Sequence, residues 1–181
     1  MTNLRALNDE DIESVELVLA YYNDRFRVSE NAIHYFTQKR HLSEEAIEVF
    51  GIGFSDRSLN KVVTEEIRGA CQRFGLIASM GVSNGREKFR GCITIPVRDE
   101  FGFLVNVYGR KICDSLRSSS KTYVKANDNN DCVFNSESLA KHSRIILCSS
   151  PMEALTLWSL GMTNVVSLLG MQSLSNSQVK Q

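Results

Sequence analysis

The sequence predicts an α/β protein in the broad sense, with a helical and mixed α/β subdomain over residues 1–140 and an incomplete βαβ unit over residues 141–181. Three observations predict this fold class. The first seventy-five residues carry apolar side chains at helical spacing, β-rich runs begin near residue 92, and the last forty residues alternate strand, helix and strand. A length of 181 residues suffices for one good-sized domain or two small ones.

Four short helices are expected in the first part of the chain. Asn8 caps the first helix, whose first turn holds three acidic residues that suit the helix dipole. Its inner face carries Ile12, Val15, Val18, Leu19 and Tyr22. The second helix runs from Ser29 to about Arg40, the third from Glu44 to Phe50 with Gly51 ending it, and the fourth from Leu59 to about Phe74. The short connections imply a compact helical subdomain.

Two β-rich runs follow, over residues 92–97 and 103–108. Their spacing predicts an antiparallel hairpin with Gly102 in its turn. Pro96 cannot donate a ladder hydrogen bond, so we expect it on an edge strand or at a strand end. Residues 117–131 are rich in Ser, Lys, Asn and Asp and are expected to form a loop.

The last part of the chain is expected to form strand, helix and strand. Residues 144–148 read as a buried strand, and Ser150-Pro151-Met152-Glu153 reads as a capping box with proline at the first helical position. Gly161 ends the helix, and residues 164–169 form a second, parallel strand that is apolar on both faces. This unit buries too little surface for a finished domain. We therefore expect a fragment, or an open strand edge that pairs with a second copy of the chain.

The composition excludes several classes of protein. The five cysteines form no C-x2-C pair and the three histidines are scattered, so we expect reduced structural thiols and no metal site. No apolar run reaches the ~18–20 residues that a membrane helix needs. The N-terminus opens into an acidic stretch rather than an apolar signal segment, so we expect a cytoplasmic protein without membrane association.

The formal net charge is zero, but basic side chains are concentrated in one segment. Residues 86–125 carry 9 basic and 4 acidic side chains, whereas residues 1–85 carry 9 and 13 and residues 126–181 carry 3 and 4. This distribution is expected if one face of the protein binds nucleic-acid phosphates. A charged surface that is only solvated would give the same distribution, so both interpretations stay open.

Three stretches, in order, carry a family resemblance. The first is Y-F-T-Q-K-R-H-L-S-E-E-A-I-E-V-F-G-I-G-F at residues 35–54, and the second is K-F-R-G-C-I-T-I-P-V-R-D at residues 88–99, followed by Gly102 and Tyr108-Gly109-Arg110. The third is the strand–helix–strand pattern of residues 145–170. Together they resemble the polymerase core of bacterial, DnaG-type DNA primases. The family motifs are Y-L-x-x-R-G-L-S-x-E-x-I-x-x-F-x-I-G, then R-F-R-x-R-x-x-F-P-I-R-D…G…G-G-R, then the opening of a Toprim fold.

The resemblance covers about residues 20–181 and implies a primase-like subdomain followed by the start of a Toprim-like domain. In the family, basic side chains hold single-stranded template or the primer–template hybrid with little sequence preference. The resemblance implies this role for Lys88, Arg90, Arg110, Lys111, Lys121 and Lys125. The chain departs from the family at Cys92 and Thr122, where the motifs have an arginine and a lysine.

The family's catalytic carboxylates are the larger departure. The glutamate of E-G-x-x-D aligns with Ser149 and the aspartate with Glu153, while the second acidic motif, D-x-D, would lie beyond Gln181. Two-metal phosphoryl transfer needs several carboxylates. We therefore expect no polymerisation by this chain and no cofactor in it, with Mg²⁺ bound only where a longer protein completes the Toprim site. Glu153 reads more simply as the acid of the capping box.

The sequence favours a primase-like replication protein or fragment, with a mobile element as one source, that binds single-stranded DNA or a primer–template. Two alternatives stay open. One is a protein-interaction module on a degenerate primase scaffold, and the other is part of an active primase whose catalytic residues lie in missing sequence. No Walker A sequence is present, so a helicase or another replication protein is the expected source of unwinding.

Overall fold

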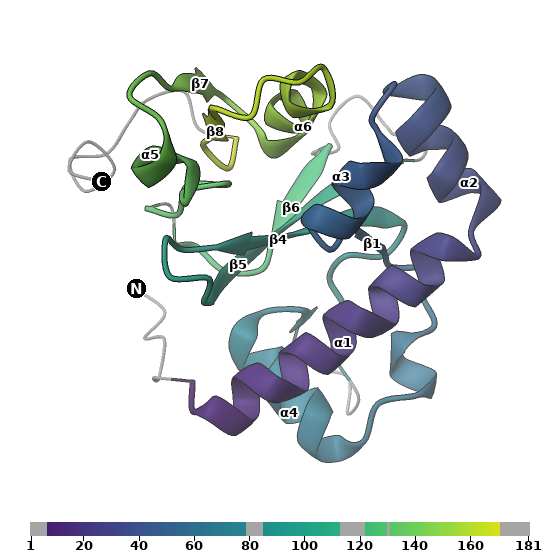
Figure 1. Cartoon of the computed structure of the whole chain (residues 1–181). Helices are drawn as coiled ribbons and strands as arrows, with labels where there is room; N and C mark the ends of the chain where they lie inside the picture. Colours follow the sequence, from purple (N-terminus) through teal and green to yellow (C-terminus); the bar gives the residue numbers. More distant parts are fainter. Residues whose placement is uncertain (1–6, 79–84, 113–121, 130, 171–181) are drawn as a thin grey trace.

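The computed structural model describes residues 7–78, 85–112, 122–129 and 131–170. Its central feature is an antiparallel sheet in the order β1-β4-β5-β6, which lies between two packed layers (Figure 1). The sheet consists of β1 (Gly53–Phe54), β4 (Cys92–Arg98), β5 (Leu104–Lys111) and β6 (Tyr123–Lys125). One layer contains α1 (Asp9–Arg27) and α4 (Glu65–Phe74), and the other contains β7 (Ile146–Cys148), α6 (Pro151–Ser159) and β8 (Val165–Ser167). The α/β fold class is confirmed.

Shorter elements connect these layers. They are α2 (Glu30–Ile33), the π-helix η1 (His34–Lys39), α3 (Glu44–Val49), the 3₁₀-helix η2 (Leu59–Lys61), β2 (Ile77–Ala78), β3 (Arg86–Glu87) and α5 (Ser138–Lys141). No helix in the described part of the chain is long and apolar enough to cross a membrane.

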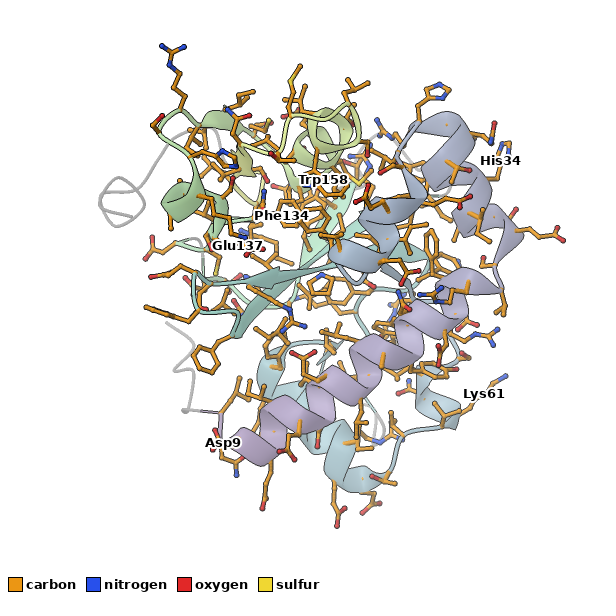
Figure 2. The ribbon with its side chains drawn as sticks, viewed as in Figure 1. Asp9, His34, Lys61, Phe134, Glu137 and Trp158 are labelled. Carbon is orange, nitrogen blue, oxygen red and sulfur yellow. The ribbon has the colours of Figure 1, made fainter. Side chains whose placement is uncertain are left out.

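The two faces of the sheet build two apolar clusters. The cluster toward α1 and α4 contains Val15, Val18, Tyr22, Cys71, Phe74, Phe89 and Val107. The cluster on the other face contains Phe26, Phe36, Ile93, Ile95, Tyr108, Phe134, Leu155 and Val165. The rings of Phe134 and Trp158 lie in this second cluster, where both pack against Phe50 at centroid distances of 4.9 and 5.2 Å (Figure 2). One core therefore joins residues on both sides of the expected division at residue 140.

The helical part follows the sequence prediction with two corrections. The side chains of Asn8, Ser29 and Ser43 cap α1, α2 and α3, as hydrogen bonds to backbone N–H groups show. The expected second helix is present from Glu30 to Lys39, but its second part, from His34, is a π-helix rather than an α-helix. The expected helix from Leu59 to Phe74 is wrong. It divides into η2 and α4, since the Thr64 side chain accepts a hydrogen bond from Ile67 N and starts a new helix there.

The hairpin is confirmed, and the sheet explains how it tolerates Pro96. β4 lies between β1 and β5, but β1 pairs only with Ile93 and Thr94. The outer edge of β4 is therefore free of ladder partners at Pro96, where no N–H is needed. The expected loop over residues 117–131 is wrong for Tyr123–Lys125, which form an edge strand paired with β5. The ring of Tyr123 stacks on Tyr108 at a centroid distance of 5.6 Å, a contact between residues far apart in sequence.

The strand–helix–strand unit is also confirmed, and β7 pairs with β8 in parallel. The open apolar edge expected at residues 164–169 is wrong, because Val165, Val166, Leu168 and Leu169 are buried. Phe134 covers the outer edge of β8 by exchanging two backbone hydrogen bonds with Ser167, at N···O distances of 2.8 and 3.2 Å. The apolar residue left exposed on this two-stranded sheet is Leu147 of β7.

Candidate nucleic-acid interface

Basic side chains gather where β4 begins and β5 ends. Two adjoining hollows of about 430 and 540 Å³ lie there, and both are lined by Arg57, Arg86 and Arg90. Lys88 and Lys111 line the first hollow as well. We call the two hollows together the basic groove.

Four of the groove cations differ from several other cations of the described chain, because they form no described ion pair. Elsewhere, ion pairs of 4.0 Å or less join Arg25 to Asp56, Arg27 to Glu48, Arg73 to Asp11, Arg98 to Glu16 and Lys141 to Glu137. Arg57, Arg86, Arg90 and Lys111 take part in none of the described ion pairs. Their charge is therefore left to face an outside anion.

Two acids belong to this region, Glu87 in the lining of both hollows and Asp56 directly before Arg57, and both accept hydrogen bonds from other residues. Glu87 is only 3 % exposed, and its Oε1 accepts hydrogen bonds from Tyr22 Oη at 2.9 Å and Ser55 Oγ at 2.5 Å. Burial raises the pKa of Glu87, against the opposing effect of the two hydrogen bonds. Asp56 accepts from Arg25 Nε at 2.6 Å and from the Ser58 hydroxyl. Burial would raise the pKa of Asp56, but these hydrogen bonds outweigh it and hold the pKa below its usual value.

Two local features place the groove cations. Residues 86–90 alternate between exposed and buried, so that Arg86, Lys88 and Arg90 face outward while Glu87 and Phe89 face inward. Arg57 has a left-handed backbone, with φ of 75°. Its guanidinium lies over Gly91, where an added Cβ would stand 3.6 Å from Arg57 Nη2.

The structure brings together three of the six basic residues implied by the resemblance. Lys88, Arg90 and Lys111 line one hollow of the groove. Lys88 is already engaged, because its Nζ donates to the Ala126 carbonyl oxygen at 2.9 Å, and partial burial lowers its pKa.

Of the other three basic residues, Arg110 and Lys125 do not line the groove. Arg110 precedes Lys111 on β5, so its side chain points to the other face of the sheet. There its Nη1 donates to Thr122 Oγ1 at 3.2 Å, next to Tyr123, the residue of β6 that pairs with Arg110. Lys125 lies on β6, near enough for its charge to contribute to the lowered pKa of Lys88. Lys121 lies outside the described residues.

Sequence reasoning missed Arg57 and Arg86. Arg86 had a signal, since the letters R-E-K-F-R place three basic residues two apart, on one face of an extended segment. No sequence signal indicated Arg57, because its loop lies next to Arg90 and Gly91 only in the folded structure.

Ser149 and Glu153 do not fit a magnesium site. Glu153 Oε2 accepts hydrogen bonds from Ser149 N at 3.0 Å and Ser149 Oγ at 2.9 Å, so the one carboxylate of this pair is engaged at the start of α6. Within the described ranges, no group of three or more His, Cys, Asp or Glu could hold a metal ion. The expected capping box is shifted by one residue, because Glu153 bonds Ser149 and the Ser150 side chain caps nothing.

Comparisons with known proteins agree with this architecture. The model of the family described as "DNA primase catalytic core, N-terminal domain" matches residues 21–139. The DNA primase of Haemophilus influenzae is 30 % identical over 107 residues, which are 56 % of this chain and 18 % of that protein. The chain thus spans less than a fifth of this curated relative.

Solved structures show the same fold. The zinc-binding and RNA polymerase domains of Aquifex aeolicus primase match with a TM-score of 0.82 at 21 % identity, covering 98 % of this chain and 46 % of that one. A DnaG primase catalytic domain bound to single-stranded DNA matches with a TM-score of 0.76 at 20 % identity, covering 94 % and 57 %. With the family model matching well over half of its residues, the chain belongs to the family of the N-terminal domain of the DNA primase catalytic core.

Proposed function

We propose that this chain binds single-stranded nucleic acid through the basic groove, as the template-holding part of a primase-like replication protein. The observation that carries this proposal is the gathering of Arg57, Arg86, Arg90 and Lys111, which form no ion pair with the described residues, around two adjoining hollows. Phosphates are the anions that arginine forks and lysine ammonium groups bind best in such surface grooves. A related primase domain has been solved with single-stranded DNA, which supports the same partner here.

The groove favours a flexible single strand read through its backbone. Its four unpaired cations come from three separate segments, the loop at Arg57, the stretch 86–90 and the end of β5. Phosphate contacts of this kind carry little sequence information. Arg110 lies on the opposite face of β5. It would contact a primer–template only if a longer protein supplied further binding surface on that face.

The experiment is a binding titration of an oligodeoxynucleotide of about twelve residues at low salt. A groove variant, Arg57→Ala with Arg90→Ala and Lys111→Ala, is expected to lose at least about a hundredfold in affinity, because three charge-assisted contacts are removed. The matched control removes Lys61, Lys141 and Arg144, which lie outside the groove, and should bind like the parent. Equal binding by the groove variant and the control would favour a protein-interaction module.

We further propose that this chain does not polymerise by itself. Ser149 cannot act as an anionic ligand at neutral pH, and Glu153 is held by Ser149. Purified protein is expected to make no labelled primer with Mg²⁺ or Mn²⁺, and Ser149→Glu alone should not change this. Template-dependent products would contradict this proposal, because they would show that residues other than Ser149 and Glu153 bind the catalytic metal ions. We also propose a helicase or another replication protein as a partner, a cytoplasmic setting and a mobile element as the source.

A further inference from the structure

A third hollow, of about 590 Å³, adjoins the basic groove and shares Arg57 with it. Its lining includes Asn31, His34, Tyr35, Lys39 and Phe54. Because three of these residues belong to η1, we call it the π-helix pocket. His34, the first residue of η1, is exposed at the surface of the molecule (Figure 2).

The chemistry of this pocket differs from that of the groove. Tyr35 and Phe54 contribute aromatic surface, while Asn31, His34 and Asp56 contribute polar groups. Tyr35 is fixed, since Arg40 lies 5.5 Å from its ring centroid and Arg40 Nε donates to its hydroxyl oxygen at 3.1 Å. Flat apolar walls with polar groups at the edge suit a nucleobase, which has two flat faces and a hydrogen-bonding rim.

Two rare backbone features border the same pocket. η1 is a six-residue π-helix, a rare conformation that is frequently found at functional sites. Arg57 has φ of 75°, a strained value for a residue with a side chain. His34, Tyr35 and Lys39 line the pocket from the π-helix, and Arg57 lines it from the opposite segment. The π-helix and the left-handed residue Arg57 therefore form two walls of the same pocket.

We propose that the π-helix pocket takes one unstacked base of the strand whose phosphates lie in the basic groove. Arg57, which lines both, would contact the phosphate between this nucleotide and the next. The inference rests on the proposed function and adds a site that recognises the base. It predicts that binding depends on the bases as well as on the charge of the strand.

The test compares two oligomers of equal length and charge, one of thymidine nucleotides and one of abasic nucleotides, by fluorescence anisotropy. The parent is expected to bind the thymidine oligomer about five- to a hundredfold more tightly, the range of one stacked base. Asn31→Trp fills the pocket from an exposed position of α2 and should reduce this ratio to near one. Gln38→Trp, exposed on η1 but outside the pocket, should leave the ratio unchanged.

The outcomes separate the two proposals. Equal affinities for the two oligomers in the parent, or an unchanged ratio in Asn31→Trp, would overturn the base pocket while salt-sensitive binding through the groove still stood. Loss of all binding in the parent would instead remove the proposed function. Circular dichroism of both tryptophan variants shows whether each is folded, and an unfolded Asn31→Trp is replaced by Asn31→Phe, read by the same ratio.

Discussion

Arg57 belongs to several parts of the candidate site at once. Its side chain lines both hollows of the basic groove and the π-helix pocket, and its backbone has a left-handed φ of 75°. Such a conformation costs a non-glycine residue of order 1 kcal/mol or more. Its guanidinium lies next to Gly91. Arg57 therefore has a strained backbone, and its side chain reaches the groove and the pocket only in the folded protein.

Replacing Arg57 with glycine separates these two properties. Arg57→Gly removes the cation and also the strain, because glycine adopts positive φ freely. We expect the free energy of unfolding to stay within about 1 kcal/mol of the parent, while affinity for single-stranded DNA falls about tenfold. Arg57→Lys keeps the charge and should retain most of the affinity. Parent-like binding by Arg57→Gly in the same titration would exclude Arg57 from the interface.

Glu87 gives a pH-dependent prediction at the same scale. Burial raises its pKa in the folded state above the ordinary value of 4.5, which applies to the unfolded chain. The stabilising contribution of Glu87 is therefore full below about pH 4.5 and is lost as the pH rises through the raised folded pKa. Glu87→Gln lacks this titration. Urea unfolding from about pH 4 to about pH 7 should show the variant gaining stability relative to the parent; a constant difference would contradict the buried carboxylate.

At the scale of elements, the segment before β4 and the strand β5 form one contact. The buried ring of Phe89 packs on Gly109, where an added Cβ would lie 2.4 Å from Phe89 Cδ1. Phe89 stands between Lys88 and Arg90, and Gly109 directly precedes Arg110 and Lys111. The absent side chain of Gly109 therefore lets β5 approach the basic stretch closely enough to build the groove.

Two glycine-to-alanine substitutions test this packing. Gly109→Ala is expected to lower the free energy of unfolding by about 1–3 kcal/mol, because Phe89 must move within a filled core. Gly69→Ala is the control. Its Cβ would meet only the flexible end of Arg73, in the interior of α4, so the same change should raise stability by about 0.5–1 kcal/mol. Similar effects of both changes in urea unfolding would mean that Phe89 does not pack on Gly109.

Elements with a local signal could be predicted, and those that depend on distant contacts could not. The caps Asn8 and Ser29 and the β-rich run at Cys92–Arg98 act within a few residues, so helix starts and the hairpin followed from the sequence. β6 depends on the stacking of Tyr123 on Tyr108, and the cover on β8 depends on Phe134. The same limit applies to the site, where Arg90 and Lys111 were predicted and Arg57 was not.

At the scale of the whole molecule, a neutral chain holds a strongly polarised surface. The formal net charge is zero, yet Glu87 and Asp56 accept hydrogen bonds from other residues, while four groove cations form no ion pair within the described part of the chain. The net charge therefore does not identify the binding partner. The location of cations that form no described ion pair indicates where an anionic partner would bind. The central claim is that these four cations bind the phosphates of a single strand.

The most direct measurement is the salt dependence of single-stranded DNA binding by the parent and by the variant with alanine at Arg57, Arg90 and Lys111. Four phosphate contacts predict a slope of about −3 for the logarithm of the binding constant against the logarithm of salt concentration. Removal of three contacts should reduce its magnitude by about 2. Binding that does not change with salt, or a slope that is the same in both proteins, would contradict the account.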